Sequence, residues 1–251
     1  MIPLKDNVGL RGLPALTIAL MAICALVFLW QVTLSGDPQS GDIEGVAAVV
    51  GGPSERDEFA AKNATSPSRI GGADEELHTG PPWWLSPFTA VLIAADLFHL
   101  AVDLLLLWIF GRTLELRLGR VGFAALIAAG VAGSILVQTL VDPDATRLVL
   151  GTGAALASVL GGYALLHPRA GVVTMSVIPM FGTIVTAPAM LVIAAWLLIG
   201  LIPPVIAVVN SNLLVGTGLE YVGYGAALAI GAAVAWTLSR GRREPDGGRL
   251  A

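Results

Sequence analysis

The sequence is poor in charge, in cysteine and in aromatic side chains. Charged residues make up 13% of the 251 positions, aromatic residues make up 6%, and Cys24 is the only cysteine. A soluble domain usually carries about 25% charged residues, and a single cysteine excludes an intramolecular disulfide. The 14 basic and 18 acidic residues give a net charge of −4, so no basic face for nucleic acid is indicated. This composition excludes a secreted enzyme, a nucleic-acid-binding domain and a soluble dinucleotide-binding domain.

What the sequence does have is long apolar runs. Hydrophobic residues make up 55% of the chain, and a membrane-spanning helix needs about 20 of them in succession. We therefore expect an all-α, polytopic membrane protein with six transmembrane helices. The second run is short, and we expect it to borrow residues from 88–97. The predicted spans are residues 13–34, 98–110, 121–141, 149–166, 186–202 and 213–238.

The distribution of Lys and Arg predicts the orientation in the membrane. Cytoplasmic loops are enriched in basic residues, and a cytoplasmic N-terminus places ten of the 14 on the inner side and four on the outer side. We expect a multi-pass protein of the cell membrane with both termini in the cytoplasm. Residues 1–12 form the cytoplasmic N-terminus, 13–239 the membrane domain and 240–251 a disordered cytoplasmic tail. Residues 35–87 form an extracytoplasmic loop, whose middle should be flexible because it is polar and rich in Gly and Pro.

Several short motifs follow one another in a characteristic order and spacing. They are IPLKD at 2–6, VFLWQ at 27–31, FHL at 98–100, LWIFG at 107–111, E-x-RLGR at 115–120, DPDAT at 142–146, VLGGY at 159–163 and PRA at 168–170. Together they resemble the bacterial members of the rhomboid family of intramembrane serine proteases. The resemblance implies a six-helix bundle with a water-accessible cavity that opens to the outside.

The same resemblance implies a catalytic site on three helices. In active members a serine at the start of the fourth helix attacks the substrate, and a histidine on the sixth helix is its general base. The serine lies in a Gly-x-Ser-Gly motif, where residues 151–154 read Gly-Thr-Gly-Ala, so Gly153 takes the serine position. The best match to the histidine motif, at 223–227, places Tyr224 at the histidine position, and a shifted register would place Tyr221 there. No histidine follows His167, so we expect neither half of the catalytic dyad.

The resemblance also implies an altered oxyanion site on the second helix. His99 is kept, but Asp103 stands where the family has asparagine, and Ala94 stands where many members have a further histidine. His99 and Asp103 share a helix face because they are four residues apart. An ionised aspartate only accepts hydrogen bonds, so it would repel an oxyanion. The interpretation of Asp103 stays open between a structural partner of His99 and a contact for a ligand or client.

We therefore predict a pseudoprotease that binds transmembrane helices of other proteins without cleaving them. The alternative is an active intramembrane serine endopeptidase with displaced residues, for which Thr152 and Ser158 are the nearest hydroxyls but lack a visible base. A small transporter that uses Asp103 would show internal repeats with paired broken helices, and none is seen. No metal-ligand set and no cofactor is indicated. The expected partners are membrane lipids and transmembrane helices, and no nucleic acid.

Three further features of the sequence are interpreted mainly in structural terms. We expect Asp96 to cap the second helix. We expect Gly223, Ala227 and Gly231 to form a small-residue face that packs against the fourth helix. A cluster of charged residues either binds anionic lipid headgroups or is inner-side anchoring with a local Glu–Arg pair. This cluster is Arg112, Glu115, Arg117 and Arg120.

Overall fold

The structure, a computed structural model, is predominantly helical. It describes residues 2–6, 12–34, 55–72, 80–94, 97–149, 151–178, 181–198 and 214–240. Three apolar helical stretches are long enough to cross a membrane, namely α1 (Ala15–Thr33), the stretch Leu97–Val141, and Leu219–Arg240. Two shorter apolar helices are α8 (Gly153–Leu166) and the helix Ala189–Leu198. The predicted helical membrane fold is confirmed, while the count of six spans stays a prediction.

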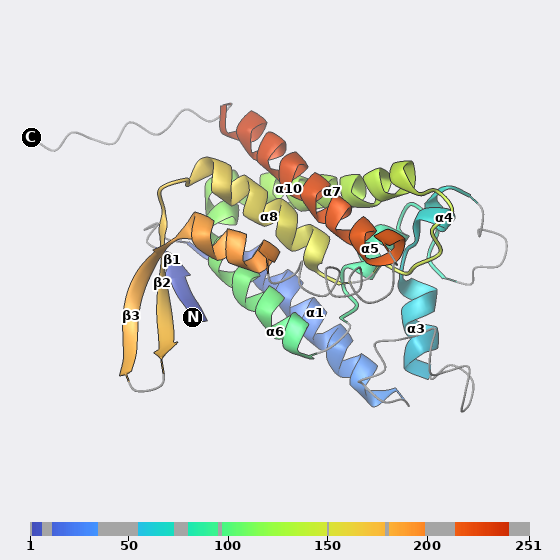
Figure 1. Ribbon diagram of the computed structural model, residues 1–251, viewed down its shortest axis with the longest axis horizontal. Coiled ribbons are helices and arrows are strands. Elements are labelled where there is room, and N and C mark those ends of the chain that lie inside the picture. Colours follow the sequence, from blue (N-terminus) through green and yellow to red (C-terminus); the bar gives the residue numbers. More distant parts are fainter. Residues whose placement is uncertain are drawn as a thin grey trace, which may run out of the picture.

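The stretch Leu97–Val141 is divided by a glycine. It comprises α6 (Leu97–Leu106), a π-helical turn η2 (Leu107–Gly111) and α7 (Arg112–Val141). Gly119 has φ 70° and ψ 166°, a conformation that side chains with a Cβ rarely adopt. The helix therefore breaks there, and Figure 1 shows α6 and α7 on different sides of the bundle. The second predicted span is thus extended beyond residue 110, not backwards into 88–97, and most of the expected inner loop is helix.

Three helices pack closely through glycine. A Cβ added to Gly161 of α8 would collide with the Leu228 backbone, and one added to Gly231 of α10 (Leu214–Arg240) would collide with the Ser158 backbone. Close approach of two helix backbones requires such small residues. The predicted small-residue face on the last helix is confirmed at Gly231. Gly223, by contrast, faces the side chains of Gln138 and Ser134 on α7.

The glycine contacts also fix the directions of these helices. Along α8 and α10 the contacts advance together, from Gly153 with Tyr224 to Gly162 with Ala235, so the two helices run parallel. Along α7 they run in the opposite order, because Gly122 lies against Leu238. The C-terminal ends of α8 and α10 therefore lie at the same end of the bundle as the Gly119 turn in α7. We name this the basic end, after the arginines found there. They are Arg112, Arg117, Arg120, Arg169 and Arg240.

A small sheet, which the sequence did not predict, lies at the basic end. Its strands are β1 (Ile2–Asp6), β2 (Gly171–Ile178) and β3 (Phe181–Pro188), in the order β1-β2-β3 with antiparallel pairing. The start of the predicted fifth span at Thr186 lies in β3, and the helix itself begins at Ala189. The N-terminal strand and the end of α10 thus share one end of the molecule (Figure 1). If both termini lie on the same side of the membrane, they must share one end of the molecule in this way. Which side of the membrane they face stays a prediction.

The segment between α1 and α6 is more ordered than its composition predicted. It contains α3 (Glu55–Asn63), α4 (Pro67–Ile70) and α5 (Ser86–Ala90). Arg69 is buried, and its guanidinium donates to the carbonyl oxygens of Ala64, at 3.0 Å, and of Pro81. A buried guanidinium is retained only when its N–H groups are paired. The expectation of a flexible middle is therefore wrong for residues 55–72.

Glu115 ties α7 to the start of α1. Its buried carboxylate accepts hydrogen bonds from the Leu16 and Thr17 amides at 2.9 and 2.7 Å, and from the Thr17 hydroxyl at 2.7 Å. The first amides of a helix have no partner within the helix, and a carboxylate there also complements the helix dipole. The prediction of a local Glu–Arg pair did not include this contact of Glu115 with α1. Arg112 instead lies over the Trp108 ring, 5.8 Å from its centre.

Candidate functional site

Gly153 and Tyr224, the residues that the sequence singled out at the start of the fourth helix and on the last helix, lie in direct contact. Gly153 is the first residue of α8, and the Tyr224 ring covers it from α10. A Cβ added to Gly153 would lie 2.7 Å from the Tyr224 Cζ and Oη atoms. The site therefore has no room for a side chain at position 153 while the tyrosine ring is in place.

Tyr224 belongs to an aromatic cluster that joins two helices. Its ring centre lies 5.5 Å from that of Tyr221 in an edge-to-face arrangement, and 6.1 Å from that of Trp196. Such pairs are favourable at these separations. Trp196 belongs to the helix Ala189–Leu198, so the ring that covers Gly153 is held by its neighbours from two helices. The start of α8 is therefore covered by an aromatic ring that packs against two further rings.

Asp103 and Thr152 form the polar part of the site. The Thr152 hydroxyl, one residue before Gly153, donates a hydrogen bond to the Asp103 carboxylate on α6. Thr152 is buried and Asp103 is half-buried. This hydrogen bond occupies one acceptor of a carboxylate within a membrane domain, where such groups are costly unless paired. Sequence reasoning named both residues but did not foresee their contact.

His99 lies at the surface of α6, whereas Ser158 lies inside the bundle. His99 is exposed, and its ring lies edge-on to Phe98 at 6.1 Å. Ser158 is fully buried and donates to the Ala155 carbonyl oxygen of its own helix at 2.7 Å. Glycines of α7 and α10 pack directly against Ser158. Its hydroxyl therefore faces a helix crossing that excludes a substrate. The predicted capping residue Asp96 lies outside the described residues.

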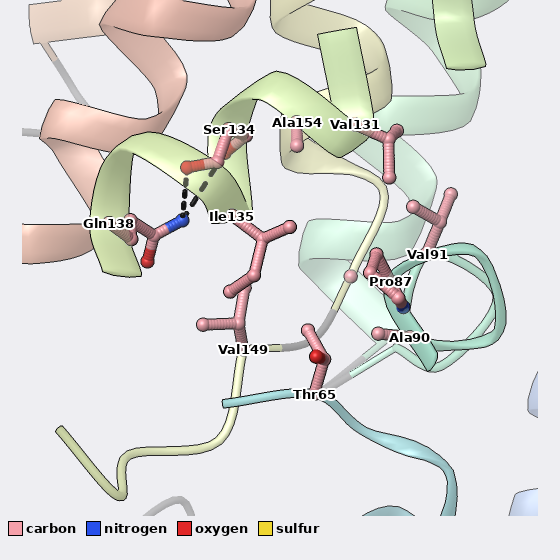
Figure 2. Close-up of a pocket in the computed structure, with 11 residues that line it drawn as sticks. Thr65, Pro87, Ala90, Val91, Val131, Ser134, Ile135, Gln138, Val149 and Ala154 are labelled. Atoms are coloured by element: carbon pink, nitrogen blue, oxygen red, sulfur yellow. Dashed lines mark hydrogen bonds between the residues drawn. The ribbon is translucent and has the colours of Figure 1, made fainter. Parts of the chain in front are cut away.

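A narrow pocket opens beside Gly153, at the end of the bundle opposite the basic end. Figure 2 shows its two walls: Gln138 and Ser134 of α7 lie on one side, and Pro87, Ala90 and Val91 lie on the other. Gln138 Nε2 donates to the Ser134 hydroxyl at 3.2 Å, whereas its buried Oε1 has no hydrogen-bond partner among the described residues. The pocket's volume, about 20 Å³, suits one water molecule, which needs roughly 10–15 Å³ on the same scale.

Thr65 and Val149 close the pocket on its outer side. They exchange two backbone hydrogen bonds, at 2.7 and 3.4 Å, which fasten the 55–72 segment to the chain that leads into α8. The Ser86 hydroxyl donates to the Thr65 hydroxyl at 2.9 Å. The outer segment is therefore part of the framework of the site.

Gln31 is another residue that sequence reasoning missed. It is buried in α1, and its side chain pairs with both backbone polar groups of Ala94: Oε1 accepts from the amide at 3.2 Å, and Nε2 donates to the carbonyl oxygen at 3.4 Å. Ala94 stands at the position where the resemblance noted in the sequence implies a further histidine. The only signal for this clamp was an uncharged amide inside an apolar run.

An exposed ion pair joins the last helix to the chain before α8. Arg147 Nε lies 3.0 Å from Glu220 Oε1, at the same end of the bundle as the pocket. Glu220 is one residue from Tyr221 and one helical turn from Tyr224. Exposed pairs contribute only about 0–1 kcal/mol each. This pair therefore adds little to the free energy of unfolding. It joins α10 to the chain before α8 near the site.

Comparison with known proteins agrees with this architecture. A search among curated proteins finds no match to the chain. The family model described as the Rhomboid domain matches residues 82–241, well over half of the chain. The matched region begins before α5 and ends just after α10, so it contains Asp103, Thr152, Gly153 and Tyr224. The chain belongs to the rhomboid family and is an integral membrane protein.

Proposed function

We propose that this rhomboid-family protein is a pseudoprotease of the cell membrane, with both termini in the cytoplasm. It binds transmembrane helices of client proteins without cleaving them. The observation that carries the proposal is the contact between Gly153 and Tyr224. Proteolysis by a serine enzyme needs a nucleophile and a base within hydrogen-bond reach. A glycine under a phenol ring supplies neither.

The remaining hydroxyls near Gly153 do not replace the missing dyad. Ser158 is enclosed between helices and bonded to its own helix backbone. Thr152 donates to Asp103, and a carboxylate is a poor general base for a threonine hydroxyl. An ionised Asp103 would also oppose negative charge developing beside Gly153. These contacts support loss of proteolysis through both the nucleophile and the oxyanion site.

Client binding follows from what a membrane-embedded polar pair can do. Helices associate in lipid through close packing and hydrogen bonds between them, not through a hydrophobic driving force. Asp103 and Thr152 offer such hydrogen bonds, and an intramembrane carboxylate usually marks a functional contact. We therefore expect clients whose transmembrane helices carry a polar or small residue at the matching depth.

The Thr152–Asp103 hydrogen bond is also the one observation that favours the alternative, an active endopeptidase with a threonine nucleophile. A cleavage assay on a transmembrane substrate and labelling by a fluorophosphonate probe decide between the two. The pseudoprotease predicts neither cleavage nor labelling. Labelling that is abolished by Thr152→Val, but not by Thr139→Val as a matched control within α7, would establish the enzyme.

Photo-crosslinking tests client binding directly. Phe98 at the start of α6 and Leu140 near the end of α7 are equally exposed, at 74%, so they form a matched pair. A photoreactive residue at Phe98, five residues before Asp103 on α6, should capture client helices. The same residue at Leu140 should capture mainly lipid. Equal capture at both positions would show contact by diffusion alone and would refute a specific client site.

A further inference from the structure

The hairpin formed by β2 and β3 carries no charged residue. Residues 171–188 contain only aliphatic residues, one phenylalanine, two methionines, prolines, glycines, threonines and one serine. The nearest charge before the hairpin is Arg169, and the next charge after it is Glu220. A hairpin that stood in the cytoplasm would be expected to carry charges on at least one face. Its composition points to an apolar environment.

The root of the hairpin lies where the membrane helices end. α8 ends at Leu166, and the helix after the hairpin begins at Ala189, whose amide donates to the Ala170 carbonyl oxygen at 2.9 Å. Val172 at the root is fully buried in the same core as Ala189. Figure 1 shows the strands extending from this root beyond the helices, to one side of the bundle.

The surface around the root is apolar and exposed. Leu165, Met190 and Leu191 are 43%, 46% and 55% exposed. In an integral membrane protein, such side chains face lipid. The uncharged hairpin therefore continues a lipid-facing surface and is separated from α8 by only a short turn.

The pairing register places no charged residue on either face of the hairpin. Strand residues alternate between two faces, and Met175 pairs with Ile184 whereas Ser176 pairs with Thr183. Both faces therefore combine aliphatic residues with small or hydroxyl-bearing ones. The whole hairpin is uncharged, and not one face alone.

The charges of β1 are confined to the root. Lys5 pairs with Val173 and Asp6 with Val172, whereas the other end of β1, Ile2, pairs with Met175. Beyond Met175 the hairpin continues without β1 as a partner and without any charge. The sheet is thus charged where it joins the basic end and uncharged towards its tip.

We propose that the hairpin formed by β2 and β3 lies in the interfacial layer of the lipid bilayer. It cannot cross the bilayer, because only helices and closed barrels satisfy every backbone group in hydrocarbon. At the interface, water and headgroups satisfy the outer edge of β3. The partner is therefore a lipid surface.

Fluorescence quenching in vesicles tests this placement. In the full chain with Cys24→Ser, a single cysteine replaces Val177 or Asp144 and carries an environment-sensitive dye. Asp144 is exposed at the opposite end of the bundle and serves as the aqueous control. The vesicles contain phosphatidylcholine and phosphatidylglycerol with a nitroxide at a shallow acyl position, and iodide is the aqueous quencher.

The expected result is that the nitroxide quenches the dye at position 177 several-fold more than the dye at 144, while iodide shows the reverse order. Iodide quenching at 177 equal to that at 144 would overturn the proposal, since the hairpin would then stand in water. Energy transfer between donor- and acceptor-labelled copies at 177, persisting at high lipid dilution, would overturn it too. That result would assign the outer edge of β3 to pairing with a second copy.

Discussion

The contact between Gly153 and Tyr224 makes a quantitative prediction about the smallest change at the site. Gly153→Ala adds one methyl group, whose carbon would lie 2.7 Å from Tyr224 Cζ and 2.8 Å from Cε1. Non-bonded carbon atoms prefer a separation of about 3.5–4.0 Å. The ring would have to move by nearly one ångström.

Neither the ring nor the helices can move by that distance without cost. Tyr224 is held by its aromatic neighbours Tyr221 and Trp196. α8 and α10 cannot separate without losing the backbone contacts at Gly161 and Gly231. Overpacking of this kind typically costs about 1–3 kcal/mol, and we expect Gly153→Ala to lower the free energy of unfolding by that amount.

A double-mutant cycle with Tyr224→Ala tests the cause. Once the ring is removed, the added methyl group meets open space, so Gly153→Ala should become nearly neutral. The coupling free energy should then approach the full overpacking cost, within the range of about 0.5–3 kcal/mol for residues in contact. Gly225→Ala is the matched control, because a Cβ there has no neighbour within 4 Å. It should be neutral or stabilising, since alanine is the better helix former.

Reversible unfolding of the detergent-solubilised protein, by steric trapping or by titration with a denaturing detergent, measures all four free energies. The reasoning is refuted if Gly153→Ala is as stable as Gly225→Ala. It is also refuted if the loss caused by Gly153→Ala is the same with and without the Tyr224 ring. Either result would mean that the two residues do not touch.

Three more predictions follow from other contacts. Glu115→Gln should lower the free energy of unfolding by about 1–3 kcal/mol, because the charged acceptor of three hydrogen bonds at the start of α1 is lost; the exposed Glu58→Gln should change it little in the same unfolding assay. Arg69→Met should speed hydrogen exchange of residues 55–72, because the Ala64 and Pro81 carbonyl oxygens lose their donor; unchanged exchange would mean that the guanidinium holds nothing in place. In a Cys24→Ser background, a cysteine at Asp57 should react with an impermeant reagent from outside intact cells and one at Arg120 should not, and the opposite pattern would reverse the orientation.

Much of the helical fold could be predicted because lipid imposes a simple rule on sequence. Long apolar runs with flanking basic residues located α1, α8 and α10 within a few residues, and the end of α7 at Val141. Features that do not depend on the length of apolar runs were not predicted. The break within α7 depends on a single backbone conformation at Gly119, and hydropathy does not distinguish that glycine from the glycines that pack helices together. The sequence therefore predicted a loop at 111–120, where most residues are helical.

The sheet was missed for a related reason. Residues 171–188 are as apolar as a membrane helix, so hydropathy alone assigned the end of this run to the fifth span. Their β-branched and hydroxyl-bearing residues favour strands, and Pro188 marks the end of β3. Pairing with residues 2–6 is a contact between segments far apart in the sequence. No local pattern encodes it.

The candidate site divides in the same way between composition and geometry. Which residues stand at 153 and 224 could be read from motif spacing, and their contact follows from the parallel packing of α8 and α10. The Thr152–Asp103 hydrogen bond and the clamp of Gln31 on Ala94 depend on how α6 and α1 approach the site, which spacing does not specify. Both involve a neutral or singly charged polar group inside an apolar run. In a membrane protein such a residue must find a partner, so its presence predicts that a contact exists, and only the fold determines with which group.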